Sequence, residues 1–256
     1  GGTVNVDDAY SASTTTVTGG TLNFNAGTHS TSMLNLSGGT LAGTGALTVT
    51  SGGAWSGGQL SGPSTLTIAS GANWAVNGGL KGFGGGTLDV QGTLSWSAAN
   101  VEVNGLGTVS IASGGLFDVQ GDVLWGDASC CSTGTTTFAV NAGGELRKSA
   151  GTGTARFGSA DTGTTGQVAL NNAGLVNVQS GTLRVGESSG TTSNSTGSFT
   201  AGSGATLQFA GATHNMNAGS SLGGLGTVSV VGGTVNVDDA YSASTTTVTG
   251  GTLNFN

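Results

Sequence analysis

A parallel β-solenoid, an all-β coil with about twenty residues in each turn, is the fold class that this sequence predicts. Three features of the 256 residues indicate it: short triplets of the form apolar, small polar, apolar; their return at a nearly constant interval; and a large apolar residue at a fixed distance after them. Helices are excluded because no window has apolar residues at i, i+3, i+4 and i+7. Glycine, which occurs 52 times, also interrupts every stretch within a few positions.

The triplets predict short strands, since a period of two places both apolar side chains on one face and the middle side chain on the other. They occur throughout the chain as Val4-Asn5-Val6, Leu22-Asn23-Phe24, Leu47-Thr48-Val49, Leu66-Thr67-Ile68, Leu88-Asp89-Val90, Val109-Ser110-Ile111, Phe138-Ala139-Val140, Leu207-Gln208-Phe209 and Val228-Ser229-Val230.

The spacing of the triplets indicates a repeat architecture. Those that begin at Leu47, Leu66, Leu88 and Val109 follow one another at offsets of 66 − 47 = 19, 88 − 66 = 22 and 109 − 88 = 21. A turn of this length cannot bury its own inner face, but stacked turns bury a continuous core. A second large apolar residue follows eight positions after the first residue of a triplet. We expect these residues to form an inward core ladder: Trp55, Trp74, Trp96, Phe117 and, after Phe138, Leu146.

An exact internal repeat dominates the organisation of the chain. Residues 1–25 return unchanged as residues 232–256, an offset of 232 − 1 = 231. Because exposed positions tolerate substitution, two old copies would have diverged. Either the 231-residue period was recently duplicated or kept uniform, or the chain is a window onto a longer tandem array. We expect the array, because Gly1 is not a start methionine and Asn256 interrupts a strand pattern. One period would hold roughly ten turns.

The chain is therefore expected to form a single solenoid segment over residues 1–256. Beyond Val119 the offset from one triplet to the next increases to 29 and 30, which predicts turns with longer loops between positions 126 and 196. These loops are expected at Gly126–Thr135, Ala150–Thr165 and Ser188–Thr196.

Composition restricts the function classes. With 12 acidic and 5 basic residues the net charge is −7, so the surface would repel nucleic acid and anionic lipid. No apolar run has the length of a membrane helix, and no signal peptide is present. Charged residues make up only 7 %, which is unusual for a soluble domain and suits an extracellular fibre better than a cytosolic enzyme.

Two stretches, GGTLNFNAGTHSTSMLNLSGGTLAGTGALTV and ATLQFAGATHNMNAGSSLGGLGTVSV, share an aromatic residue (Phe24, Phe209) and a Thr-His pair (Thr28-His29, Thr213-His214). They resemble the strand repeats of giant bacterial surface proteins, the filamentous-haemagglutinin-like adhesins and autotransporter passenger domains. The resemblance implies an extracellular, right-handed β-helix with a structural or adhesive role.

Cys130 and Cys131 are disulfide candidates. They are adjacent in the loop-like segment GDASCCSTG, so on a strand they would face opposite ways. In an oxidising setting a vicinal disulfide, a bond to another chain and free thiols all remain open, and a cross-link between neighbouring strands of a fibre is favoured.

Metal binding and catalysis are not expected, and no cofactor is predicted. Asp118, Asp122 and Asp127 raise the question of a calcium site, but no calcium-repeat pattern is present and solvated carboxylates explain them better. Arg147-Lys148, about one turn away, would complete a cleft of the kind in β-helical polysaccharide enzymes. With five basic residues in all and no catalytic motif, the chain is predicted not to be an enzyme.

Other binding surfaces are also disfavoured. The aromatic ladder would serve as a sugar-stacking stripe only if it faced outward. An ice-binding array needs more regular threonines than the middle strand positions provide, and His29 and His214 are expected at edges or corners. The preferred hypothesis is a structural repeat unit of an extracellular bacterial fibre whose partner is itself, end to end, with lateral bundling open. The alternative is an adhesin stalk with a glycan- or receptor-binding loop region.

Overall fold

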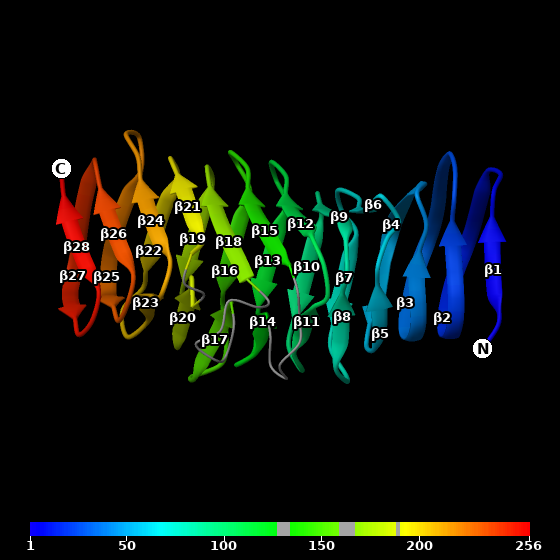
Figure 1. The fold of residues 1–256 in the computed structure, drawn as a ribbon, viewed down its shortest axis with the longest axis horizontal. Coiled ribbons are helices and arrows are strands. Elements are labelled where there is room, and N and C mark those ends of the chain that lie inside the picture. The colour runs from blue at the N-terminus through cyan, green and yellow to red at the C-terminus, as the bar shows by residue number, and fades with distance from the viewer. Residues whose placement is uncertain (127–133, 159–166, 188–189) are drawn as a thin grey trace.

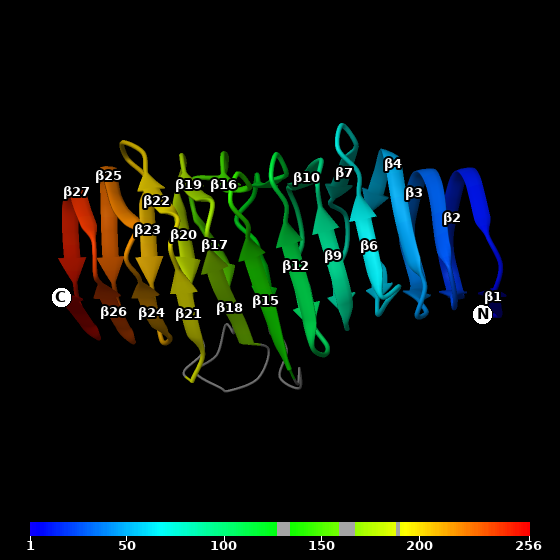
Figure 2. The same cartoon turned by 90° about the horizontal axis from the view of Figure 1, so that it is seen from above.

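The computed structural model describes residues 1–126, 134–158, 167–187 and 190–256. The chain coils into an elongated parallel β-solenoid, with the two termini at opposite ends of the long axis (Figure 1). The view from above shows strands of successive turns side by side along that axis (Figure 2). No helix occurs among the described residues. The predicted fold class is therefore confirmed.

The described residues contain 28 strands, all short except where one strand continues around a corner. In chain order they are β1 (Thr3–Val6), β2 (Tyr10–Phe24), β3 (Thr28–Ala42), β4 (Ala46–Trp55), β5 (Gly58–Leu60), β6 (Thr65–Ile68), β7 (Asn73–Val76), β8 (Lys81–Phe83), β9 (Gly86–Val90), β10 (Thr93–Trp96), β11 (Val101–Val103), β12 (Gly107–Ile111), β13 (Leu116–Val119), β14 (Leu124–Gly126), β15 (Thr135–Val140), β16 (Glu145–Lys148), β17 (Thr154–Phe157), β18 (Gln167–Asn172), β19 (Leu175–Val178), β20 (Thr182–Val185), β21 (Thr192–Ser195), β22 (Ser198–Ala201), β23 (Thr206–Phe209), β24 (Thr213–Met216), β25 (Ser221–Val230), β26 (Thr234–Val237), β27 (Ala240–Val248) and β28 (Thr252–Phe255).

Each turn has three faces, which we call A, B and C in the order in which the chain visits them. Face A stacks the first parts of β2, β3 and β4 with β6, β9, β12, β15, β18, β21, β24, β26 and β28. Face B stacks the middle of β2 and β3, the end of β4, then β7, β10, β13, β16, β19, β22 and the first parts of β25 and β27. Face C stacks β1, the ends of β2 and β3, then β5, β8, β11, β14, β17, β20, β23 and the ends of β25 and β27.

The triplets form these strands because their two apolar side chains point into the coil. In β6, β9 and β23 the apolar positions are buried and the middle residue is half-buried. The registers place Leu47 against Leu66, Leu66 against Leu88, and Leu88 against Val109, as the spacing predicts. Like residues therefore stack on like residues from turn to turn, and the core is one continuous column.

The five residues predicted as a core ladder all lie inside the coil, on face B, but they occupy two adjacent ladders. Trp74, Phe117 and Leu146 share one ladder with Leu94. Trp55 and Trp96 occupy the next ladder, two positions further along the strand. All five are at most 1 % exposed. The aromatic side chains thus pack in the core and do not form an outer sugar-stacking stripe.

Two of the intervals expected to be loops contain strands. β17 lies within the interval 150–165 and pairs with β14 and β20, while β21 lies within 188–196 and pairs with β24. At β21 the backbone ladder on face A is bridged by side chains, since the amides of Leu170 and Asn172 donate to the hydroxyls of Ser193 and Ser195. This substitution of side-chain for backbone acceptors separates β21, β24, β26 and β28 into a sheet of their own.

Candidate functional site

The two ends of the solenoid are the most distinctive surfaces of the molecule. Both carry inward-type apolar residues that nothing covers in the single chain: Val4 is 59 % exposed at one end, and Phe255 is 60 % exposed at the other. Their sequence equivalents inside the solenoid, Val235 and Phe24, are fully buried. Each end therefore presents the surface that the interior of the solenoid buries.

The repeated segment folds into the same turn at both ends. In each copy the first strand pairs with the last in one register, Thr3 with Thr21 and Thr234 with Thr252. The offset between the paired threonines is identical in the two copies, because 21 − 3 = 252 − 234 = 18. The two copies are therefore interchangeable as building units.

Side-chain contacts reproduce this identity. The amide of Asn25 donates to the carboxylate of Asp7 at 2.6 Å, and that of Asn256 donates to Asp238 at 2.6 Å. The tyrosines of the two copies lie over the equivalent phenylalanines, with ring centroids 5.3 and 5.0 Å apart. Both partners of each contact lie within the repeated segment, so the conformation of the turn does not depend on which strands lie next to it.

An asparagine ladder runs along the outside of face A to the C-terminal end. The amide of Asn215 donates to Asn194, that of Asn236 to Asn215, and that of Asn254 to Asn236, each at 2.8 or 2.9 Å. Such stacked amides each satisfy a donor and an acceptor of the neighbouring turn. Asn23 and Asn5 make the same 2.8 Å bond at the other end, so the amide pairing is part of the repeated turn.

Four of the five basic residues gather in the turns between residues 118 and 187. Arg147 holds Asp118 by two bonds of 3.0 and 3.1 Å. Burial by itself raises the pKa of the Asp118 carboxyl, but hydrogen bonds from Arg147 and Gln120 outweigh it, so that pKa lies below its ordinary value. Lys148 is fully buried, and its Nζ lies 3.2 Å from Asp122. The carboxylates of Asp118 and Asp122, two of the three considered for calcium, are thus engaged by cations.

A second charged group lies on the outside of face C. Arg156 and Arg184 are ladder neighbours, which would repel each other without a shared anion. Glu187, nearly buried, supplies it: both oxygens accept from Arg156, and Oε1 also lies 2.6 Å from Nε of Arg184. The cluster has the form of a structural ion network in which one carboxylate bridges two guanidinium groups and leaves a net charge of +1.

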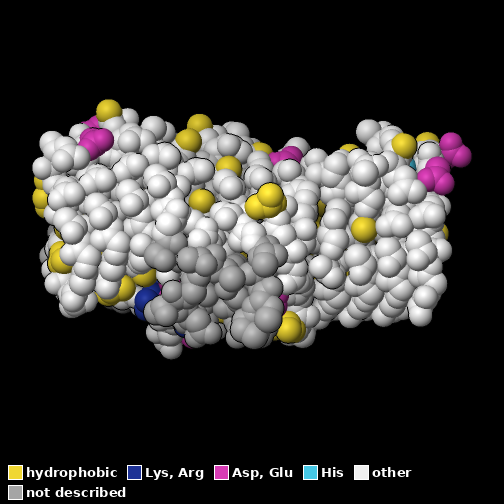
Figure 3. All heavy atoms as spheres, viewed as in Figure 1, with side chains coloured by type: hydrophobic (Ala, Val, Ile, Leu, Met, Phe, Trp, Pro, Cys, Tyr) yellow, Lys and Arg dark blue, Asp and Glu magenta, His cyan; other side chains and the backbone are white. Residues whose placement is uncertain are grey.

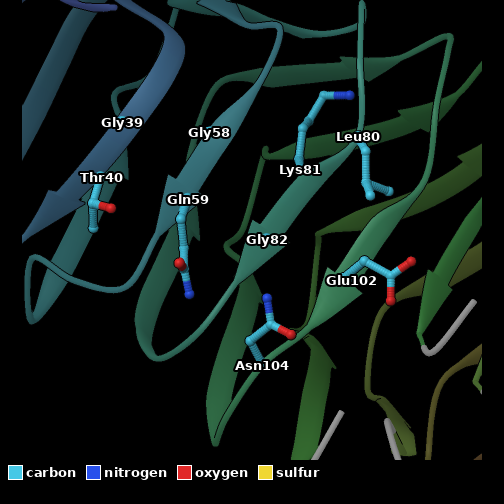
Figure 4. Close-up of a pocket in the computed structure, with 9 residues that line it drawn as sticks. All are labelled: Gly39, Thr40, Gly58, Gln59, Leu80, Lys81, Gly82, Glu102 and Asn104. Atoms are coloured by element: carbon cyan, nitrogen blue, oxygen red, sulfur yellow. The ribbon is translucent and has the colours of Figure 1, made fainter. Parts of the chain in front are cut away.

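A groove of about 360 Å³ follows the outside of face C near β5, β8 and β11 (Figure 4). Its floor is the backbone of Gly39, Gly58 and Gly82, and the side chains of Gln59 and Asn104 fill the gap that Gly82 leaves. The ammonium group of Lys81 points away and donates to two backbone carbonyls, while burial lowers the pKa of Lys81 to about 8. Side-chain amides and the carboxylate of Glu102 line the groove. These groups do not form an acid–base pair.

His29 and His214 are buried core residues, and the expectation of edge or corner positions for them is wrong. Each ring packs on an aromatic ring of the preceding turn, His29 on Phe24 at 4.7 Å and His214 on Phe209 at 4.9 Å between centroids. Among the described residues Nε2 of His214 has no hydrogen-bond partner. Burial lowers the pKa of His214 to about 4.

Acidification is therefore expected to destabilise the solenoid through His214. Above pH 6.5 the imidazole is neutral in both the folded and the unfolded chain and has no effect. Between pH 6.5 and about 4 the unfolded chain binds a proton that the folded chain excludes, so stability falls, by about 3 kcal/mol at the lower limit. Thermal unfolding followed by circular dichroism from pH 7.5 to 4 measures this loss. The His214→Leu variant should lose less stability over this range, and parallel curves for the two proteins would contradict the assignment.

Cys130, Cys131 and Asp127 lie outside the described residues, so the pairing of the cysteines stays a prediction. No group of three or more His, Cys, Asp or Glu side chains that could hold a metal occurs in the described part of the chain. That part also contains no helix long and apolar enough to cross a membrane. On the side of the molecule shown in Figure 3, hydrophobic atoms are visible in small scattered groups, and Lys and Arg atoms are visible only beside the grey region.

None of the protein-family models, curated proteins or solved structures compared with this chain matches it.

Proposed function

We propose that this chain is a structural repeat unit of an extracellular bacterial fibre, in which solenoids continue end to end through the repeated turn. The observation that carries the proposal is the different burial of the same phenylalanine in the two copies of the repeated turn. Phe24 is fully buried beneath β3, whereas Phe255, its exact repeat, is 60 % exposed. This difference in burial supports a further copy of the third strand, β3, as the segment that covers the C-terminal end.

The energetics support continuation over closure. An uncovered turn exposes apolar side chains and a row of unpaired backbone groups, which are a template for another chain. A head-to-tail contact of this kind uses different surfaces on its two sides, so it does not close and produces filaments. The low charge, 7 % of residues, and the resemblance to bacterial surface repeats support an extracellular location.

Electron microscopy of the 256-residue chain at increasing concentration tests the proposal. We expect thin unbranched filaments. The Phe255→Lys variant should remain as short single rods, because stacking would bury an unpaired ammonium group. Leu106→Lys is the matched control: Leu106 is 75 % exposed on the side of the solenoid, so this variant should form filaments like the original chain.

Two results would refute end-to-end stacking: single rods of the original chain at every concentration, or filaments of Phe255→Lys as long as those of the original. The alternative function, an adhesin stalk with a glycan- or receptor-binding loop region between residues 126 and 196, stays a prediction. Deleting the loops and measuring attachment to glycans distinguishes it from a purely structural role.

A further inference from the structure

We propose that the C-terminal end face, formed by β27 and β28, takes the segment Ala26–Ala42 of a further copy of this chain, and that each copy is rotated by one third of a turn relative to the one before. The inference rests on the proposed function. It adds a symmetry to the fibre, which follows from the number of strand pairings in one period.

The number of turns in one period can be counted from the strand pairings on face C. Ten successive parallel pairings lead from β1 through the ends of β2 and β3, β5, β8, β11, β14, β17, β20 and β23 to the end of β25. The chain has then made ten whole turns. The next strand, β26, repeats the sequence of β1 but pairs with β24 and β28, which belong to face A. One 231-residue period therefore contains ten turns plus one face.

The other parts of the repeated turn shift in the same direction. Tyr10 pairs with His29 on face A, whereas Tyr241, its repeat, pairs with Leu222 on face B. Val17 pairs with Leu36 on face B, whereas Val248 pairs with Val230 on face C. All three faces are thus exchanged in cyclic order. The residues outside the described ranges do not affect the count, because the pairings on face C continue past each of them.

The repeated turn can occupy either orientation because its three sides are alike. Its inward pairs, Val4 and Val6, Tyr10 and Ala12, Thr15 and Val17, follow one another around a single short turn. The structure contains both placements, with Asn23 bonded to Asn5 and Asn254 bonded to Asn236 at 2.8 Å in each. A seam that joins the last turn of one copy to β3 of the next therefore needs no adjustment of the register.

The rotation determines how the fibre displays its surface. Three periods make 31 whole turns, so the fibre repeats along its ladders only after about 149 Å at about 4.8 Å per turn. The charged groups around Arg147 and Arg156 lie on faces B and C in one copy, and would lie on C and A, then on A and B, in the next two. No face carries a continuous charged stripe, and a neighbouring filament or ligand meets the same surface from three sides.

Separate 256-residue chains would continue the coil differently, because β1 of one chain would follow β28 of the chain before. Eleven pairings on face C lead from β1 to the end of β27, and β28 follows on face A, so the next β1 would lie on face B, over the first part of β27. Each separate chain would then add eleven turns and two faces, about 56 Å at about 4.8 Å per turn, instead of the ten turns and one face, about 50 Å, of a covalent period. Both the axial advance and the rotation thus distinguish a polymer of separate chains from a covalent array.

Cryo-electron microscopy of a covalent three-period chain, residues 1–256 followed twice by residues 26–256, tests the proposal. We expect one continuous solenoid in which equivalent residues of consecutive periods lie on different faces, when their ladders are traced through the map. A matched control chain joins residue 230 directly to residue 7 and so omits the face-shifting strand Thr234–Val237. Equivalent residues of its consecutive copies should lie on the same face, ten turns apart.

Equivalent residues on the same face in the first chain would overturn the rotation and leave end-to-end stacking intact. Separate rods with a break at each seam would instead overturn the proposed function, and with it the occupant assigned to the end face. The two failures are therefore distinguishable in one map.

Discussion

Replacement of Trp125 by alanine is expected to lower the free energy of unfolding by about 4 kcal/mol, because it empties the centre of the aromatic core. The Trp125 ring has centroids of five other rings within 6.3 Å: Trp55, Phe83, Trp96, Phe117 and Phe138. It is fully buried on face C and closes the coil against face B. Chemical denaturation followed by circular dichroism measures the loss.

Two comparisons separate lost packing from a general sensitivity of the fold. Trp125→Phe keeps most of the ring contacts and should lose clearly less stability than the alanine variant. Leu146→Ala and Leu106→Ala make the same chemical change at a buried and at an exposed position, so the first should cost about 3 kcal/mol and the second under about 0.5 kcal/mol. Equal losses for the two leucines would contradict the assigned core.

Trp125 also shows where the sequence ceases to predict the structure. On face A the triplets alternate strictly, so their period of two and their nearly constant spacing predict both strands and register. On face C the strands are as short as Leu-Trp-Gly in β14 and Lys-Gly-Phe in β8, and these do not alternate. At β8 an inward lysine, satisfied by carbonyls of Gly79 and Ala98, replaces the apolar residue that would have revealed the strand.

The end faces are partly predictable from the sequence. The exact return of residues 1–25 indicates continuation, and the spacing of the triplets indicates roughly ten turns per period. The extra third of a turn is not predictable, because the offset between paired positions varies from 22 − 4 = 18 for Val4 and Leu22 to 170 − 138 = 32 for Phe138 and Leu170. The number of faces in one period can be counted only when the strand pairing of every turn is known. Each histidine lies five residues after its aromatic partner, but the sequence alone does not indicate that the chain turns a corner between the two and brings both rings inside the coil.

Gly53 lies at the first place where the predicted core ladder passes from one observed ladder to the other, and this position carries the second large prediction. On face B, Gly53 lies between Leu34 and Trp74 in the ladder, where another large residue would be expected. Because Gly53 has no side chain, the Trp74 indole reaches across its turn and donates from Nε1 to the carbonyl of Leu34 at 3.0 Å, two turns away. The same indole stacks on Trp55, with centroids 5.9 Å apart.

Gly53→Ala is therefore expected to cost at least about 4 kcal/mol, as the sum of three effects. Its φ of 124° strains any L side chain. A Cβ would overlap the Leu34 carbonyl oxygen and force the turns apart. The buried Trp74 N–H would also lose its acceptor. Gly71→Ala is the matched control, since Gly71 has a φ of 81° but open space around its Cβ, and it should cost only about 1 kcal/mol. If denaturant unfolding gave equal losses for the two variants, backbone strain alone would explain Gly53, and its role as the gap that admits Trp74 would be wrong.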